Sequence, residues 1–154
     1  MNFTIVCIGK MRFKPYRDAA DEYIKRLQHY VPTQEIELKP QSAPKWSEAQ
    51  VKQKESELIL QSIPPQSYLF VMDERGKLMD SQTFAQKIQS VLVTNPQIAF
   101  AIGGAYGHDE MLRKKAQCVF GLSPLTFPHE LARVILTEQL YRAMTILKGE
   151  PYHK

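Results

Sequence analysis

Short apolar runs, separated by stretches with helical signals, constrain the fold of this chain more than any other feature. Four runs are apolar at nearly every residue: Phe3–Ile8, Tyr68–Met72, Ile98–Ile102 and Cys118–Phe120. A strand that is apolar on both faces is typical of a parallel sheet covered by helices on both sides. Glu35–Leu38 instead alternates, which indicates a strand with one solvated face. The pattern predicts an α/β fold with a mostly parallel sheet flanked by helices.

The stretches between these runs carry the start signals of helices. Pro15 is well placed at the first position of a helix, and Ser47 begins a sequence that resembles a capping box with Gln50. Ser81 is expected to cap another helix. We expect helices over about 15–28, 47–62, 81–93, 109–115 and 129–147, and a turn over 73–77. With 154 residues and no internal repeat, the chain is predicted to form one domain, residues 1–154.

Composition excludes several classes of protein. No run approaches the ~20 apolar residues that span a bilayer, and Met1–Ile8 is typical of a first strand rather than a signal peptide. We therefore expect a cytoplasmic protein. A disulfide between Cys7 and Cys118 is possible, but two buried free thiols are favoured. The histidines lack zinc spacing, so no metal is expected. The net charge of +4 is compatible with nucleic acid but is common in enzymes.

Three predicted strands end in residues that could build a ligand pocket. They end at Met72-Asp73, at Ile102-Gly103-Gly104 and at Gly121-Leu122-Ser123. Ligands of open α/β sheets bind beyond the carboxyl ends of the strands, and glycine lets a ligand approach the backbone closely. A tight strand-to-helix turn is the simpler explanation of the two glycines alone. Neither a dinucleotide fingerprint nor a Walker A loop is present, so phosphate cradling is not supported.

The segment Ser123–Pro128 combines apolar side chains with loop residues. Pro124 and Pro128 stiffen it. Its free backbone groups could bind the edge of an adenine, with Leu125 and Phe127 as walls. A loop that merely packs against the protein is an equal alternative.

The predicted helix over 129–147 is apolar on more than one face, which is typical of a buried helix. We expect it to contact its own sheet and a second subunit. Arg133 and Arg142 interrupt it. Each could form a surface ion pair, for example Arg133 with Glu130, or could bind a phosphate or carboxylate. His129 could be a structural residue, and the terminal Tyr152-His153 could be frayed.

Several motifs together resemble the RlmH-type SPOUT methyltransferases. They are Ile102-Gly103-Gly104, the Leu122-Ser123-x-Leu125-Thr126-x-Pro128-His129 run, Glu138-Gln139-Leu140-Tyr141-Arg142-Ala143 and Pro151-Tyr152-His153-Lys154. The resemblance covers essentially the whole chain. It implies a homodimer with a C-terminal trefoil knot, a fold that ordinary topology rules would reject. It also implies methylation of N3 of a pseudouridine in 23S rRNA, on assembled ribosomes, with S-adenosylmethionine as the methyl donor.

The resemblance also assigns residues. The cofactor site would comprise Met72, Gly103, Gly104, Leu122, Ser123, Pro124, Leu125, Thr126 and Phe127. Met72 departs mildly from the aliphatic residue that the family has there. Removal of the N3 proton requires a base or a positive environment. The candidates are His153 and Tyr152 near the reacting base, with Arg142 as electrostatic partner and His129 as a weaker candidate.

Two other classes of function remain open. A ribosome-associated RNA-binding protein without enzymatic activity would explain the charge and the tail, but not the paired pocket loops. A nucleotide-binding hydrolase would need phosphate-cradling or metal-binding residues, which the sequence lacks.

Overall fold

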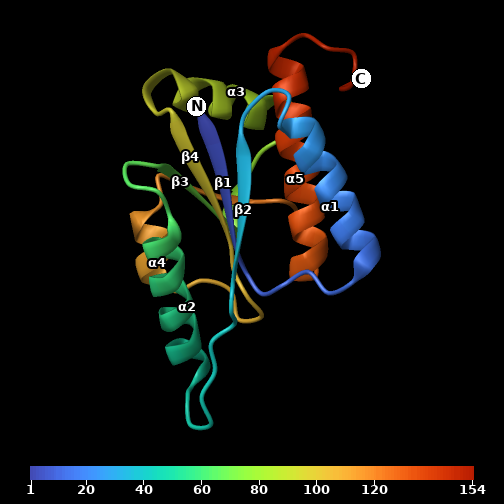
Figure 1. Cartoon of the computed structure of the whole chain (residues 1–154). Coiled ribbons are helices and arrows are strands. Elements are labelled where there is room, and N and C mark those ends of the chain that lie inside the picture. Colours follow the sequence, from blue (N-terminus) through green and yellow to red (C-terminus); the bar gives the residue numbers. More distant parts are fainter.

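The computed structural model describes residues 1–154 and has a central sheet with helices on both faces (Figure 1). The strands are β1 (Asn2–Ile8), β2 (Thr33–Leu38), β3 (Tyr68–Leu78), β4 (Gln97–Ile102) and β5 (Cys118–Gly121). They lie in the order β2-β1-β4-β3-β5, and every neighbouring pair is parallel. The predicted parallel α/β sheet is confirmed. The trefoil knot stays a prediction from the resemblance.

The helices divide between the two faces of the sheet. They are α1 (Lys14–Leu27), α2 (Glu48–Ser62), α3 (Ser81–Thr94), α4 (Glu110–Lys115) and α5 (His129–Leu147). Side chains alternate across a strand, so in β1 Phe3 and Ile5 join the core beneath α1, α3 and α5. Val6 and Ile8 join the smaller core beneath α2 and α4. This double cover explains why the strands are apolar on both faces.

Most predicted boundaries agree with the structure, and the capping box is confirmed. The Ser47 hydroxyl accepts from the Gln50 N–H at 3.3 Å, and the Gln50 side chain accepts from the Ser47 N–H at 2.8 Å. The cap predicted at Ser81 is wrong. Asp80 caps α3 by accepting from the Thr83 N–H at 2.7 Å, and the Ser81 hydroxyl bonds instead to Gln139 in α5.

The turn predicted over 73–77 is part of β3. Met72 and Lys77 both pair with Phe120 of β5, so the residues between them form an irregular excursion within a strand that continues to Leu78. Gly76 makes this possible, because a Cβ there would lie 2.4 Å from the carbonyl carbon of Phe120. The sequence signals marked the departure from regular pairing, but not the return of the strand to its neighbour.

The apolar faces of α5 are covered largely by other elements of the same chain. The helix packs against α1 and α3 as well as the sheet, so its apolar faces do not by themselves require a second subunit. Arg133 is buried, and it pairs with Glu35 at 2.5 Å and with Glu37 rather than with the predicted Glu130. Those two carboxylates belong to β2, and the ion pairs therefore join α5 to the edge of the sheet.

Both cysteines are free, as predicted, and burial raises the pKa of Cys7 to about 12. No helix is both long enough and apolar enough to cross a membrane. No group of three or more His, Cys, Asp or Glu side chains is arranged to hold a metal ion.

Candidate functional site

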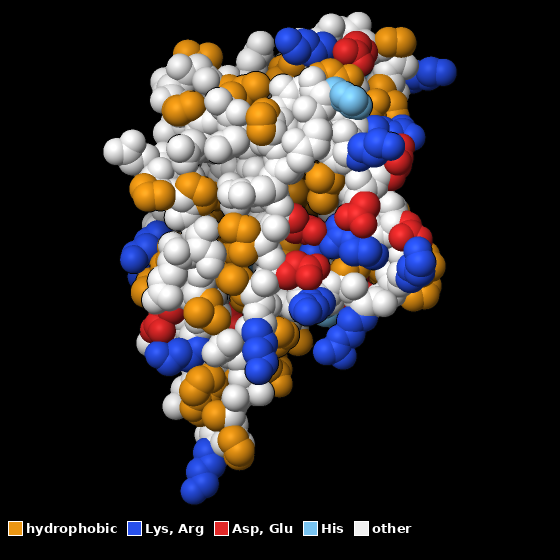
Figure 2. Space-filling model, viewed as in Figure 1, with side chains coloured by type: hydrophobic (Ala, Val, Ile, Leu, Met, Phe, Trp, Pro, Cys, Tyr) orange, Lys and Arg blue, Asp and Glu red, His pale blue; other side chains and the backbone are white.

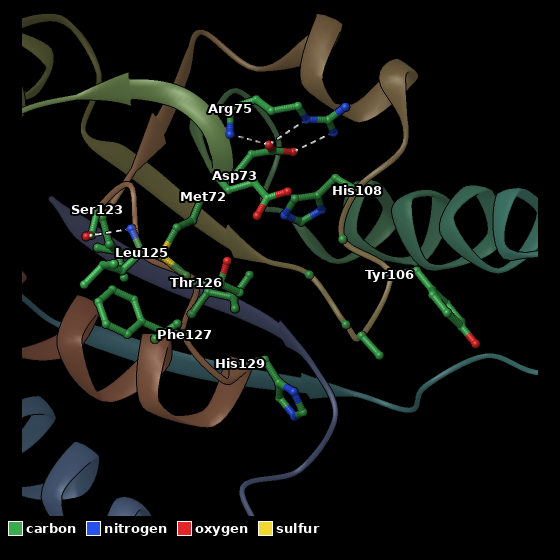
Figure 3. Close-up of a pocket in the computed structure, with 18 residues that line it drawn as sticks. Met72, Asp73, Arg75, Tyr106, His108, Ser123, Leu125, Thr126, Phe127 and His129 are labelled. Carbon is green, nitrogen blue, oxygen red and sulfur yellow. Dashed lines mark hydrogen bonds and ion pairs between the residues drawn. The ribbon is translucent and has the colours of Figure 1, made fainter.

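A cavity of about 280 Å³ lies at the carboxyl edge of the sheet, where β4 and β5 end and β3 departs from regular pairing after Met72, beside the start of α5 (Figure 3). Because the strands are parallel, their following loops meet at this edge. The lining residues are Met72–Arg75, Ile102–His108, Leu122, Ser123, Leu125–Phe127, His129 and Ala132. Eight of the nine residues predicted for the cofactor line this cavity; Pro124 does not.

The Gly103-Gly104 loop is both a tight turn and a wall of the cavity. The Gly107 N–H donates to the Gly104 carbonyl at 3.0 Å, which folds the loop back on itself. A Cβ on Gly103 would lie 3.1 Å from Cε1 of His108, and one on Gly104 would lie 2.8 Å from Oε2 of Glu55. Side chains at these positions would press on the Gly107-His108 part of the cavity wall and on Glu55, which packs behind the loop.

The Leu122–Phe127 loop supplies the apolar wall. In Figure 3 the side chains of Leu125, Thr126 and Phe127 lie beside Met72, which projects from β3. The Ser123 hydroxyl accepts from the Leu125 N–H at 3.0 Å and shapes this turn. Backbone groups and apolar side chains thus face one space, an arrangement suited to a flat heterocycle.

Asp73 and His108 form the polar side of the cavity. The sequence pattern placed Asp73 at a strand end beside the pocket without a predicted role, and His108 was not predicted at all. Burial works to raise the pKa of Asp73, but hydrogen bonds from Arg75 at 2.9 and 3.1 Å and the charge of Arg113 outweigh it and lower the pKa. Asp73 is therefore a carboxylate. Its place directly after an apolar strand was the available signal.

His108 is buried, with 3% of its surface exposed, and neither ring nitrogen has a hydrogen-bond partner. Burial lowers its pKa to about 4, with the charge of Asp73 and the carbonyl of Met72 opposing the shift. The imidazole is neutral near pH 7, and its two ring nitrogens are buried behind the cavity wall. Nothing in the sequence beyond its position after the glycine loop marks this residue.

The predicted catalytic residues fall into two places. His129 lines the cavity at the first position of α5. Arg142 lies thirteen positions further along the same helix, about 20 Å away at 1.5 Å per residue. Tyr152 and His153 lie with Arg142 at that far end (Figure 1). Within one chain the structure does not bring the tail to the cavity.

The tail is held against the helix rather than frayed. The Tyr152 hydroxyl donates to Glu138 at 3.0 Å, and its ring packs edge-on against Tyr141 at 4.7 Å between centroids. Arg142 donates to the same Glu138 oxygen at 2.6 Å and lies 3.3 Å from Nδ1 of His153. Burial, then hydrogen bonding to Tyr23 and Glu138, raises the pKa of Tyr152, so its phenol stays protonated.

Comparisons with known proteins show which family and which fold the chain resembles. The family model described as "Predicted SPOUT methyltransferase" matches residues 1–153. The chain is 44% identical over 159 residues to ribosomal RNA large subunit methyltransferase H of Alkaliphilus oremlandii, with 100% of each chain covered. It is 42% identical over 156 residues to the protein of the same name from Parabacteroides distasonis, with 99% of each chain covered.

One solved structure extends the comparison to the fold. A probable methylase family protein from Haemophilus influenzae matches with a TM-score of 0.58 at 16% identity. The match covers 99% of this chain and 70% of that one, and it supports the fold alone.

Proposed function

Because the chain belongs to the SPOUT methyltransferase family, we propose that it methylates N3 of a pseudouridine in 23S rRNA, using S-adenosylmethionine and acting on assembled ribosomes. The observation that carries the proposal is the single cavity lined by eight of the nine residues that the resemblance assigns to the cofactor. The names of the full-length relatives support rRNA as the substrate.

The lining of the cavity fits a nucleoside-containing methyl donor. The 122–127 loop and Met72 would hold the adenine between apolar side chains and backbone groups. His108 would contribute a neutral ring to the wall, with both of its nitrogens buried behind it. When bound, the donor supplies an electrophilic methyl group. Much of the catalysis then consists of positioning the acceptor nitrogen in line with it.

A homodimer with a shared active site accounts for the separation between cavity and tail. The tail lies about 20 Å from the cavity of its own chain, at the other end of α5. We propose that the tail of one subunit covers the cavity of the other. Tyr152 and His153 of that tail, with Arg142 from α5 of the same subunit, would then meet the nucleotide across the interface, while His129 belongs to the cavity itself.

Proton removal from N3 would be assisted by positive charge. Glu138 neutralises part of the charge of Arg142. The guanidinium is nevertheless a permanent cation on α5 beside the tail. A cation beside the pseudouridine lowers the pKa of its N3–H, because it stabilises the anion that forms.

We also propose a cytoplasmic location, because the proposed substrate is the assembled ribosome.

Three measurements test the proposal. Calorimetry should detect S-adenosylmethionine binding, and purified bacterial ribosomes incubated with methyl-labelled donor should gain one methyl group on a 23S pseudouridine, located by mass spectrometry. Ribosomes with uridine at that position serve as the substrate control. Sedimentation should show a dimer at micromolar concentration. A chain that binds no S-adenosylmethionine, or labels no rRNA, is not this enzyme.

A further inference from the structure

Two loops at the carboxyl edge hold the net positive charge of the chain. We call residues 9–14, after β1, and 39–47, after β2, the basic loops. They contain Lys10, Arg12, Lys14, Lys39 and Lys45 and no acidic residue. The chain has 20 Lys and Arg in all, so 15 lie elsewhere, against 16 Asp and Glu. Without the basic loops the protein would carry no positive excess.

Most of these cations are free to bind a partner. Lys10, Arg12, Lys39 and Lys45 are exposed and form no ion pair. Only Lys14 is paired, with Asp18 at 2.6 Å. Lys and Arg side chains reach the lower end of the molecule, where the connection between β2 and α2 projects beyond the sheet (Figures 1 and 2). Projecting, unpaired cations fit a polyanion.

Exposed aromatic rings lie at the same edge. Phe13, Trp46 and Tyr106 are 53%, 36% and 50% exposed, and they are the only aromatic side chains among the exposed large hydrophobics. Phe13 and Trp46 belong to the two basic loops, and Tyr106 belongs to the glycine loop of the cavity. Aromatic rings beside cations are typical of proteins that bind unpaired nucleotides, because the rings stack on the bases and the cations bind phosphates.

The basic loops begin at the wall of the cavity. A Cβ on Gly9 would lie 3.8 Å from Nε2 of His129, which lines the cavity, and 3.8 Å from Cγ of Pro40. The first basic loop therefore begins beside His129, and the second begins beside the first. A strand lying along them would bring one of its nucleotides to the cavity mouth.

We infer that the basic loops, together with Tyr106, bind an unpaired segment of rRNA that flanks the nucleotide to be methylated. The inference rests on the proposed function and adds to it the surface that recognises the substrate. The segment is unpaired because stacking on Phe13, Trp46 and Tyr106 requires exposed base faces, and because N3 of a paired base is covered.

The test compares matched pairs of substitutions at opposite edges of the sheet. Lys39→Gln/Lys45→Gln removes two charges from the basic loops, and Lys114→Gln/Lys115→Gln removes two exposed charges at the end of α4, just before β5. Binding of each fluorescently labelled protein to purified bacterial 70S ribosomes is measured from 50 to 300 mM KCl. The first pair should weaken binding about tenfold and reduce the slope of log K against log salt by about 1.4, or ~0.7 for each lost phosphate contact.

Stacking is tested separately. Trp46→Ala should weaken ribosome binding about tenfold with an unchanged salt slope, whereas Val93→Ala, which shortens an 81% exposed side chain in α3, should change neither. All four variants should bind S-adenosylmethionine with the wild-type affinity. Loop variants that bind ribosomes like the wild type, with the same salt slope, would overturn the surface but leave the proposed function standing. A wild-type protein that binds no ribosome would overturn both.

Discussion

Nη1 of Arg142 lies 3.3 Å from Nδ1 of His153, and this contact determines which ring nitrogen of the neutral imidazole carries the proton. A guanidinium has donors only, so Nδ1 must be the acceptor. The neutral ring of His153 then carries its proton on Nε2, the nitrogen left free. In this arrangement the Nε2–H of His153 is free to donate to a substrate. The ring could take a proton from N3 only after leaving Arg142.

His153→Gln should therefore retain more activity than His153→Ala, because the glutamine amide can replace an Nε2–H donor but not a base. We expect the alanine variant to lose less kcat than removal of residues 151–154, at most about a hundredfold, and the glutamine variant to lose about tenfold. The measurement is kcat on ribosomes from pH 6 to 9. A glutamine variant as poor as the alanine variant, with an altered pH profile, would assign His153 the role of base.

Removal of residues 151–154 should abolish most methylation but little else. The deletion takes away Tyr152 and His153 but leaves Arg142 and Glu138 paired on α5. Ribosome methylation should fall by ~100-fold or more, with dimerisation intact and S-adenosylmethionine affinity only modestly weaker. Sedimentation, calorimetry and a methylation assay on one preparation would separate these effects. Wild-type methylation by the truncated protein would mean that the tail is dispensable.

Gly103→Val should abolish cofactor binding while the fold survives. The side chain would not simply fill the cavity, since the new Cβ meets Gly107 and His108 at 3.1 Å. We expect the 104–108 loop to be displaced, and the affinity for S-adenosylmethionine to fall beyond calorimetric detection. Ala49→Val, on the exposed start of α2, is the matched control. Unchanged affinity in the glycine variant would refute the assignment of this loop to the cofactor.

Arg133→Met should destabilise the protein by about 2 kcal/mol, because Glu35 and Glu37 lose their buried cation and keep only the more exposed Arg17. Arg26→Met is the control. It breaks an exposed pair with Glu22, and should leave the free energy of unfolding nearly unchanged. Urea denaturation of both variants at equal protein concentration gives the comparison. Equal stability of the two variants would show that Arg133 is not needed to compensate these carboxylates.

Stability should fall on acidification because of His108. Its pKa is about 4 in the folded state against an ordinary value of 6.5, so below pH 6.5 the unfolded chain binds a proton that the folded chain does not. The contribution of His108 to the free energy of unfolding is fully present above pH 6.5 and decreases as the pH falls to about 4. The contribution at pH 5 relative to pH 7 is about 2 kcal/mol. His108→Leu should lose less stability than the wild type between these two pH values in urea titrations, and equal losses would contradict the shift.

Much of the fold follows from local sequence, because apolar runs and caps act over a few residues. Ser47 and Gln50 are three positions apart, and their reciprocal bonds could be predicted directly. The return of β3 to Phe120 could not, since it depends on a neighbour more than 40 residues away. Arg133 shows the same limit: Glu130 was the nearest carboxylate in sequence, but β2 brings Glu35 and Glu37 closer in space.

The position of the cavity could be predicted from the sequence, because the carboxyl ends of parallel strands meet at one edge of the sheet. Met72, Gly103 and Leu122 each follow or end an apolar strand, and all three line it. His108 was missed because burial, rather than any neighbouring motif, makes its ring distinctive. The resemblance implies that the tail covers the nucleobase being methylated, but it does not say in which subunit's cavity that nucleobase lies. The length of α5 raises this question, because the helix separates the tail from the cavity of its own chain.

Helix α5 also fixes an angular relationship between its two ends. His129 begins the helix at the cavity, and Arg142 leaves it beside the tail. At 3.6 residues per turn, one inserted residue between them would advance the tail by only ~1.5 Å but would rotate it by about 100°. Such an insertion would aim Tyr152 and His153 in another direction while leaving the cavity untouched. The number of residues between His129 and Arg142 is therefore constrained, because it sets the direction in which the tail leaves the helix. Insertions there should be tolerated far less than side-chain substitutions.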